Sequence, residues 1–283
     1  MNAARHLALT GVPRSGTTLC CHLLGQVAGT VALFEPIEVQ KLPRGREAAL
    51  EAVAAFYAQS RASLESDGTA WSQQVDGRVP DNPFSSQRGS DGQRRHEATR
   101  GRIRFDAPLP RGFTLAIKHN AAFTALLPEL AARFDTCAIV RNPLAVLASW
   151  HSVDLPVSQG RLPAGEHFDP DLAKRLDAET DRVSRQLLIL DWLFERYARH
   201  LPPSRVLAYE TVVATGGAAL AAAFGLELAA QPLAERNASR LYSAQVCEEL
   251  ALRLQKDRGA WRSRYGDDDV AALLRRMRGG ALE

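Results

Sequence analysis

The chain has 283 residues, of which 46% are hydrophobic and 24% charged, and its 35 Lys and Arg face 32 Asp and Glu. This length predicts a single domain over residues 1–283, or a domain with a long insertion. A net charge of +3 argues against a nucleic-acid partner, and no apolar run approaches the ~20 residues of a membrane-spanning helix. Because the first predicted strand begins near residue 6, a signal peptide has no room, and we expect a cytoplasmic enzyme.

Short apolar runs alternate with helical patterns along most of the chain. The predicted strands are 6–10, 31–34, 113–117, 136–140 and 205–209. The predicted helices are 17–27, 46–57, 121–133 (whole, or split at Pro128), one from 144, 171–200, 218–224, 239–255 and 268–277. Residues 60–111 are rich in Gly, Pro, Ser, Asp and Arg, which predicts an irregular, partly ordered insertion or lid. Residues 155–170 are predicted to form a loop. The alternation predicts an α/β fold with a parallel sheet covered on both faces.

A glycine-bounded loop joins the first strand to the first helix, with the sequence G-V-P-R-S-G-T-T-L over residues 11–19. Backbone N–H groups at the start of a helix lack intrahelical partners and carry partial positive charge, so this context suits a bound phosphate. Hydroxyl groups and one guanidinium add further donors. The expected anion-binding residues of this loop are Arg14, Ser15, Gly16, Thr17 and Thr18.

The loop departs from the nucleoside-triphosphate pattern G-x-x-x-x-G-K-[ST], because Thr17 stands where Lys is required. In this form it resembles the 5′-phosphosulfate loop of sulfotransferases that use 3′-phosphoadenosine 5′-phosphosulfate (PAPS). The likeness is greatest to tyrosylprotein and many bacterial sulfotransferases. It implies the three-layer α/β sandwich of P-loop NTPases, with a central sheet of about five strands. It also implies that PAPS is the co-substrate and that Arg14 stabilises the leaving phosphate.

A second segment follows the predicted strand 136–140, where R-N-P at 141–143 opens a helix that carries Ser149. An arginine at a strand end can offer paired donors to a phosphate monoester. The segment resembles the 3′-phosphate-binding segment of PAPS sulfotransferases, which implies this role for Arg141 and Ser149. The strand ends in Arg141, so it does not supply the acidic metal ligand that a kinase needs.

Two residues compete as general base for the acceptor hydroxyl. Glu35 stands in L-F-E-P, which resembles a segment of carbohydrate 6-O-sulfotransferases and the glutamate that follows the loop in tyrosylprotein sulfotransferases. His119 follows Lys118 and resembles the K-T-H-L-P segment of cytosolic sulfotransferases, although no residue separates Lys118 from His119 here. That likeness implies contact of Lys118 with the transferring group. Histidine suits neutral pH better than an ordinary glutamate, and the two residues could also act together.

The remaining likenesses are weaker. Tyr209, in the Y-E pair that ends the last predicted strand, resembles a residue beside the adenine, and an aromatic residue packed at the sheet edge is an equal alternative. Lys256 and Arg258 resemble a late basic loop that contacts the 3′-phosphate, but a solvated charged turn explains them better. The four cysteines show no C-x-x-C spacing and the seven histidines no ligand spacing, so we expect buried thiols and no metal.

These features predict an enzyme that moves a sulfuryl group from PAPS to a hydroxyl of a small-molecule or glycan-like acceptor, releasing 3′-phosphoadenosine 5′-phosphate. Two alternatives remain open: an atypical P-loop kinase, and an inactive protein of the PAPS fold that binds a partner through residues 60–111. The acceptor and the oligomeric state cannot be inferred from the sequence.

Overall fold

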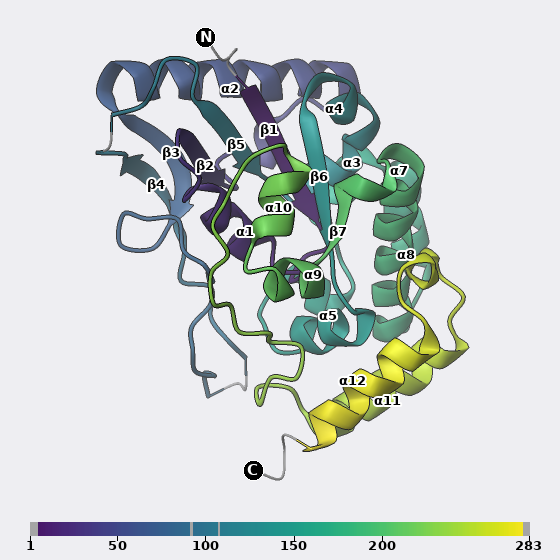
Figure 1. The fold of residues 1–283 in the computed structure, drawn as a ribbon. Helices are drawn as coiled ribbons and strands as arrows, with labels where there is room; N and C mark the ends of the chain where they lie inside the picture. The colour runs from purple at the N-terminus through teal and green to yellow at the C-terminus, as the bar shows by residue number, and fades with distance from the viewer. Residues whose placement is uncertain (1–4, 91–92, 107, 280–283) are drawn as a thin grey trace.

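Five parallel strands form the central sheet in the order β2-β5-β1-β6-β7 (Figure 1). The structure is a computed structural model that describes residues 5–90, 93–106 and 108–279. The strands are β1 (Arg5–Gly11), β2 (Thr30–Phe34), β5 (Thr114–Lys118), β6 (Asp135–Val140) and β7 (Val206–Ala208). The α/β fold with a parallel sheet of about five strands is therefore confirmed.

Helices cover both faces of this sheet, because successive strand residues point to opposite faces. On one face, Leu7 and Leu9 pack with three helices: α1 (Thr17–Leu24), α9 (Tyr209–Ala214) and α10 (Ala218–Ala223). On the other face, Ala8 belongs to the larger core, which takes in the remaining helices next to the sheet. These are α2 (Arg46–Asp67), α3 (Ala121–Ala125), α4 (Leu127–Arg133), α5 (Pro143–Trp150) and α8 (Arg182–His200).

The topology leaves a crevice at the carboxyl end of the sheet. The chain leaves β1 toward β2 on one side, whereas it leaves β6 toward β7 on the other side. The loops after β1 and β6 therefore diverge, and ligands of open α/β sheets bind where such loops part. Both predicted phosphate-binding segments start at these two strand ends.

The segment 60–111 is more regular than its composition predicts. The helix α2 continues to Asp67, because no Gly or Pro interrupts it before Gly68, which ends the helix at a φ of 70°. Two antiparallel strands follow, β3 (Thr69–Gln74) and β4 (Thr99–Arg104). The insertion, expected to be irregular and only partly ordered, thus contains the end of a long helix and a two-stranded sheet, and its residues 91, 92 and 107 lie outside the described residues.

Other predicted boundaries also shift. The helix predicted over 171–200 is two helices, α7 (Pro170–Ala178) and α8, because the Asp181 carboxylate caps a new helix by accepting from the Ser184 N–H at 2.8 Å. The loop predicted over 155–170 contains a 3₁₀ turn, η2 (Pro156–Gln159), and α6 (Pro163–Phe168). The split at Pro128 is confirmed by the break between α3 and α4.

The chain ends in two helices that pack together, α11 (Ala244–Lys256) and α12 (Asp267–Gly279). Both also pack against α5, at the carboxyl end of β6. The short 3₁₀ turns are η1 (Val39–Lys41), η3 (Pro203–Arg205) and η4 (Ala260–Ser263). In the described part of the chain, no helix combines the length and apolar character needed to cross a membrane.

Candidate anion-binding and transfer site

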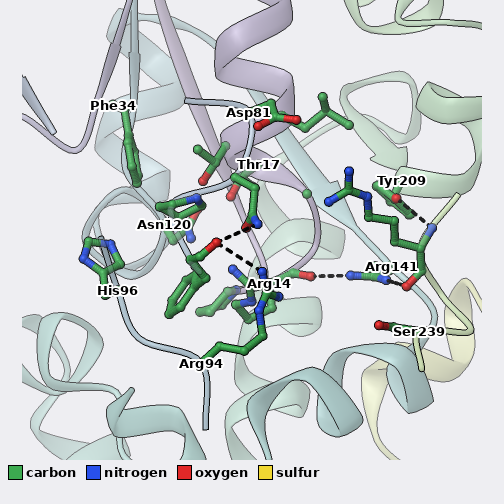
Figure 2. A pocket seen from close by; sticks show the side chains of 18 of the residues that line it. Arg14, Thr17, Phe34, Asp81, Arg94, His96, Asn120, Arg141, Tyr209 and Ser239 are labelled. Carbon is green, nitrogen blue, oxygen red and sulfur yellow. Dashed lines mark hydrogen bonds between the residues drawn. The ribbon is translucent and has the colours of Figure 1, made fainter. Parts of the chain in front are cut away.

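A cavity of about 570 Å³ opens at the carboxyl ends of β1, β2, β5 and β6. Its walls come from the loop after β1, the ends of β2 and β5, the insertion between β3 and β4, and the segment before α11. Figure 2 shows Arg14 in the middle of the pocket, with Phe34, His96 and Asn120 on one side and Arg141, Tyr209 and Ser239 on the other. Residues far apart in the sequence thus meet in the crevice that the strand order creates.

The loop 11–19 comes so close to its neighbours that its two glycines have no room for a side chain. A Cβ on Gly11 would lie 2.4 Å from the Ile139 carbonyl oxygen. A Cβ on Gly16, whose φ is 88°, would lie 2.5 Å from Cδ2 of the Tyr209 ring. Gly16 precedes α1, so the unpaired N–H groups of the first turn and the hydroxyls of Thr17 and Thr18 are presented at the pocket wall.

Gly16→Ala is expected to destabilise the fold by about 1–3 kcal/mol, because it combines a strained φ with a steric clash against Tyr209. The measurement is urea unfolding. Gly77→Ala is the matched control, since Gly77 has a φ of 76° but nothing within 4 Å of the added Cβ. An equal loss of unfolding free energy in the two variants would show that the close approach of Tyr209 to the loop does not make Gly16 harder to replace.

Arg14 occupies the centre of the pocket, and no carboxylate of the described residues pairs with it. Its Nε donates to Oγ of Ser149 at 3.1 Å, and its guanidinium lies 4.2 Å from the centre of the Phe84 ring. Burial lowers the pKa of Arg14 to about 9, with further lowering from the charges of Arg94 and Arg141. The group stays charged at pH 7, and a bound anion would relieve this unfavourable environment.

Arg141 lies at the end of β6 and is 5% exposed. Its Nη1 donates to the Arg14 carbonyl oxygen at 2.9 Å, which ties the end of β6 to the loop after β1. Its guanidinium also stacks 4.6 Å from the centre of the Tyr209 ring. The same ring also packs against Gly16 in the loop after β1. Tyr209 therefore contacts both predicted phosphate-binding segments.

The pocket gathers four arginines, and two of them were not found from the sequence. Arg94 comes from the insertion between β3 and β4, and Arg236 comes from the segment before α11. Within residues 5–90, 93–106 and 108–279, none of the four forms an ion pair with a carboxylate. The four are Arg14, Arg94, Arg141 and Arg236. Arg94 and Arg141 are buried, Arg14 lies in the interior of the pocket and Arg236 is exposed. Buried cations without a counter-charge are costly, so this arrangement fits an anionic ligand.

Glu35 and Lys118 form an ion pair at the pocket wall. Lys118 is 2% exposed and its Nζ donates to Oε1 of Glu35 at 2.5 Å. The Glu35 side chain is 31% exposed, and no described residue hydrogen-bonds its Oε2. Burial raises the pKa of Glu35, but the charges of Lys118 and His119 and the hydrogen bond from Lys118 outweigh it and leave the pKa below its usual value.

Backbone strain coincides with the same residues. Outside glycine, the described residues with positive φ are Arg14 at 71°, Glu35 at 40° and Asp76 at 49°. Such conformations cost about 1–3 kcal/mol each and persist where the surrounding structure enforces them, often at functional sites. Two of the three are residues that the sequence singled out for chemistry.

His119 does not line the pocket. It is 7% exposed, packs against Phe123, and places Nε2 3.0 Å from the Ile37 carbonyl oxygen. Because a carbonyl can only accept, Nε2 carries the hydrogen. Burial lowers the pKa of His119, so the ring is neutral at pH 7. Asn120, the next residue, lines the pocket instead, and so does His96 from the insertion.

Four other predicted site residues do not line the pocket. Ser15 is fully buried, and its hydroxyl donates to the Ile139 carbonyl oxygen at 2.9 Å. Ser149 is 1% exposed, does not line the pocket, and has its hydroxyl engaged by Arg14. Lys256 and Arg258 lie exposed at the end of α11, and neither lines the pocket. Arg236 and Ser239 line the pocket near Arg141, so basic and hydroxyl groups do reach it from late in the chain, but from other positions.

The metal-ligating side chains at the pocket wall are Glu35, Asp81 and His96, and they are scattered rather than gathered among the described residues. The described residues contain no cluster of three or more His, Cys, Asp or Glu that could hold a metal ion. The four cysteines are buried and unpaired, and burial raises the pKa of Cys137 and Cys247 to about 11. Reduced, inert thiols are therefore expected at neutral pH.

Comparisons with known proteins do not identify the family of this chain. No family model matches the chain, and no curated protein matches it. One similar solved structure is the sulfotransferase domain of the olefin synthase from Synechococcus PCC 7002, with 15% identity and a TM-score of 0.39. The alignment covers 97% of this chain and 95% of that domain. A similarity of this size does not assign the chain to a family.

Proposed function

We propose that the protein is a PAPS-dependent sulfotransferase that acts on a hydroxyl group. The observation that carries the proposal is the pocket of four arginines that pair with no carboxylate in the part of the chain that the structure describes. The pocket is built around a phosphate loop that lacks the lysine of triphosphate enzymes. The loop 11–19 offers backbone N–H groups and Arg14 to a 5′-phosphosulfate. Arg141 offers its guanidinium to the 3′-phosphate. Its Nη2 donates to the Arg236 carbonyl oxygen, and Ser239 lies on the same side of the pocket (Figure 2).

The residues present fit such a ligand. The loop has no side chain at Gly11 or Gly16 to obstruct the backbone, and its helix N-terminus faces the cavity. Arg141 has five N–H hydrogens, and described residues accept three of them. One hydrogen on each terminal nitrogen remains, which suits two oxygens of a phosphate monoester.

The proposed reaction needs a base for the acceptor and a donor for the leaving group. The acceptor oxygen forms a bond to sulfur while the bond from sulfur to the bridging phosphate oxygen breaks. Glu35 takes the acceptor proton through Oε2, and Lys118 holds Oε1. Arg14 and the loop N–H groups stabilise the electron pair left on the phosphate oxygen. The products are a sulfate ester and 3′-phosphoadenosine 5′-phosphate.

The acceptor would bind on the side of the pocket lined by Phe34, His96 and Asn120 (Figure 2). Burial lowers the pKa of His96, against the opposing charge of Glu35, so its ring is neutral at pH 7 and can accept or donate a hydrogen bond. These residues suit a neutral hydroxyl compound.

A transfer assay with ³⁵S-labelled PAPS and alcohols from the glycan, phenol and lipid classes tests the activity. If no alcohol receives the label although the product nucleotide binds tightly, the result would favour an inactive binding protein.

Arg141→Ala is expected to weaken binding of 3′-phosphoadenosine 5′-phosphate by about 100-fold, because it removes two charge-assisted hydrogen bonds worth about 1.5 kcal/mol each. Isothermal titration calorimetry gives the affinity. Arg199→Ala is the control, since Arg199 is exposed and pairs with Glu195 outside the pocket. An unchanged affinity in Arg141→Ala would remove this arginine from the proposed 3′-phosphate site.

A further inference from the structure

A buried asparagine links the Arg141 guanidinium to a carboxylate that never contacts it. Asn237 is 3% exposed and accepts from Nε of Arg141 at 2.6 Å through Oδ1. Its Nδ2 donates to Oε1 of Glu210 at 2.7 Å. The amide orientation follows from its partners, since a guanidinium can only donate and a carboxylate can only accept. Asn237 therefore bridges a cation and an anion with both ends of one side chain.

Glu210 is itself held in place by neutral donors. The Asn142 N–H donates to Oε1 at 3.1 Å, and the Tyr265 hydroxyl donates to Oε2 at 2.9 Å. Among the described residues, Glu210 has no ion pair with a lysine, arginine or histidine. The carboxylate thus connects the end of β6, the start of α9 and the approach to α12, and Asn237 extends this connection to Arg141.

The Arg141 guanidinium is fixed on three sides. Nη2 donates to the Arg236 carbonyl oxygen at 2.7 Å, Nη1 donates to the Arg14 carbonyl oxygen, and Nε is held by Asn237. The ring of Tyr209 supports one face of the group. The same ring accepts, through its hydroxyl, from the Arg236 N–H at 3.1 Å. With these contacts in place, rotation of the guanidinium requires several bonds to break together.

We propose that Asn237, oriented by Glu210, is a positioning residue that aims the two remaining N–H groups of Arg141 at the 3′-phosphate. This inference rests on the proposed function. The amide spacer matters because a carboxylate in direct contact would pair with Arg141 and compete with the ligand for its donors. Through Asn237, the chain gains a fixed guanidinium that remains available to an anion. Preorganised donors bind a charged ligand without a further loss of side-chain entropy.

The test compares two ligands that differ only in the 3′-phosphate: 3′-phosphoadenosine 5′-phosphate and adenosine 5′-monophosphate. Calorimetry gives the ratio of their dissociation constants, which isolates the gain from the 3′-phosphate. For the unaltered protein we expect a gain of about 100-fold, and for Asn237→Ala a gain about tenfold smaller, with the affinity for the monophosphate within about twofold. Asn237→Asp, nearly the same size, should reduce the gain further, because the new carboxylate pairs with Arg141 and, with no hydrogen to donate, repels Glu210 instead of being oriented by it. Gln255→Ala, at an exposed site on α11, should leave the ratio unchanged.

The outcomes separate the two proposals. A gain near one in the unaltered protein would contradict the proposed function. A large gain that persists in both Asn237→Ala and Asn237→Asp would overturn the positioning role while leaving the function standing. An equal loss for both ligands would also overturn it, since that pattern indicates general disruption of the pocket. If Asn237→Ala does not fold, Asn237→Asp and Tyr265→Phe, which removes the hydrogen bond at the far end of the chain of contacts, carry the test.

Discussion

Replacing Glu35 with glutamine should reduce the rate of sulfuryl transfer by about 10²–10⁴-fold, the usual contribution of a positioned general base. The affinity for 3′-phosphoadenosine 5′-phosphate should stay within about twofold, because in the proposed reaction Glu35 contacts the acceptor and takes its proton only during transfer. Glutamine can still accept a hydrogen bond from Lys118, which limits the structural disturbance. Steady-state rates and calorimetry on the same preparations separate the two effects.

Glu38→Gln is the matched control, because Glu38 is only three residues away but does not line the pocket. Its turnover should equal that of the unaltered protein. A Glu35→Gln variant that transfers sulfate at the unaltered rate would exclude Glu35 as the base. His119 would then need another route to the acceptor, since it does not line the pocket.

The pH dependence follows from the direction of the Glu35 shift. Its pKa in the folded protein lies below the ordinary 4.5, so the carboxylate is ready to accept a proton throughout the neutral range. The acid limb of kcat/KM should fall below pH 4.5, and it should be absent in Glu35→Gln. For stability the sign is the same: the Glu35 contribution is complete above pH 4.5 and is lost as the pH falls through the lowered value.

Arg14→Ala should reduce the transfer rate by about 10²–10³-fold, as expected when one preorganised donor to a developing negative charge is removed. The guanidinium lies in the middle of the pocket, between the acceptor side and Arg141 (Figure 2). Arg14→Lys keeps the charge but loses the planar pair of donors. Its transfer rate should therefore lie between that of Arg14→Ala and that of the unaltered protein. The rate is measured with labelled PAPS at saturating acceptor.

Arg104→Ala is the control for loss of positive charge, since Arg104 is exposed on β4 and does not line the pocket. An Arg14→Ala variant with the unaltered rate would contradict the role of this side chain. It would leave only the loop N–H groups to stabilise the leaving oxygen.

The central sheet could be predicted from the sequence because its strands are short apolar runs, which are local features. The pairing of β3 with β4 could not be predicted from the sequence. Thr69 pairs with Arg104 across most of the insertion, and the sequence of β4, T-R-G-R-I-R, shows no apolar alternation. The end of α2 was predictable in principle, since Ser60 and Leu64 continue its buried face. The helical spacing of the buried positions continues through residues 60–64, but the polar residues between them obscured it.

The candidate site also contains some residues that could be predicted from the sequence and others that could not. Arg14, Glu35 and Arg141 each follow a strand, so their convergence followed from the rule that ligands bind at carboxyl ends of parallel strands. Arg94, Arg236 and the Asn237 bridge belong to irregular segments without a motif. Their approach to the pocket depends on long-range packing of the insertion and of the segment before α11, which no local pattern encodes. The burial of His119 likewise depends on contact with the Ile37 carbonyl and Phe123.

Both proposals require that one nucleotide binds with its two phosphate groups at Arg14 and at Arg141. Calorimetry of the unaltered protein with 3′-phosphoadenosine 5′-phosphate, beside ATP with Mg²⁺, tests this directly. We expect the bisphosphate to bind at least about tenfold more tightly, since the loop lacks the lysine that serves a triphosphate. Tighter binding of ATP with Mg²⁺, or no heat from the bisphosphate, would show that the pocket does not bind a bisphosphate nucleotide in this way.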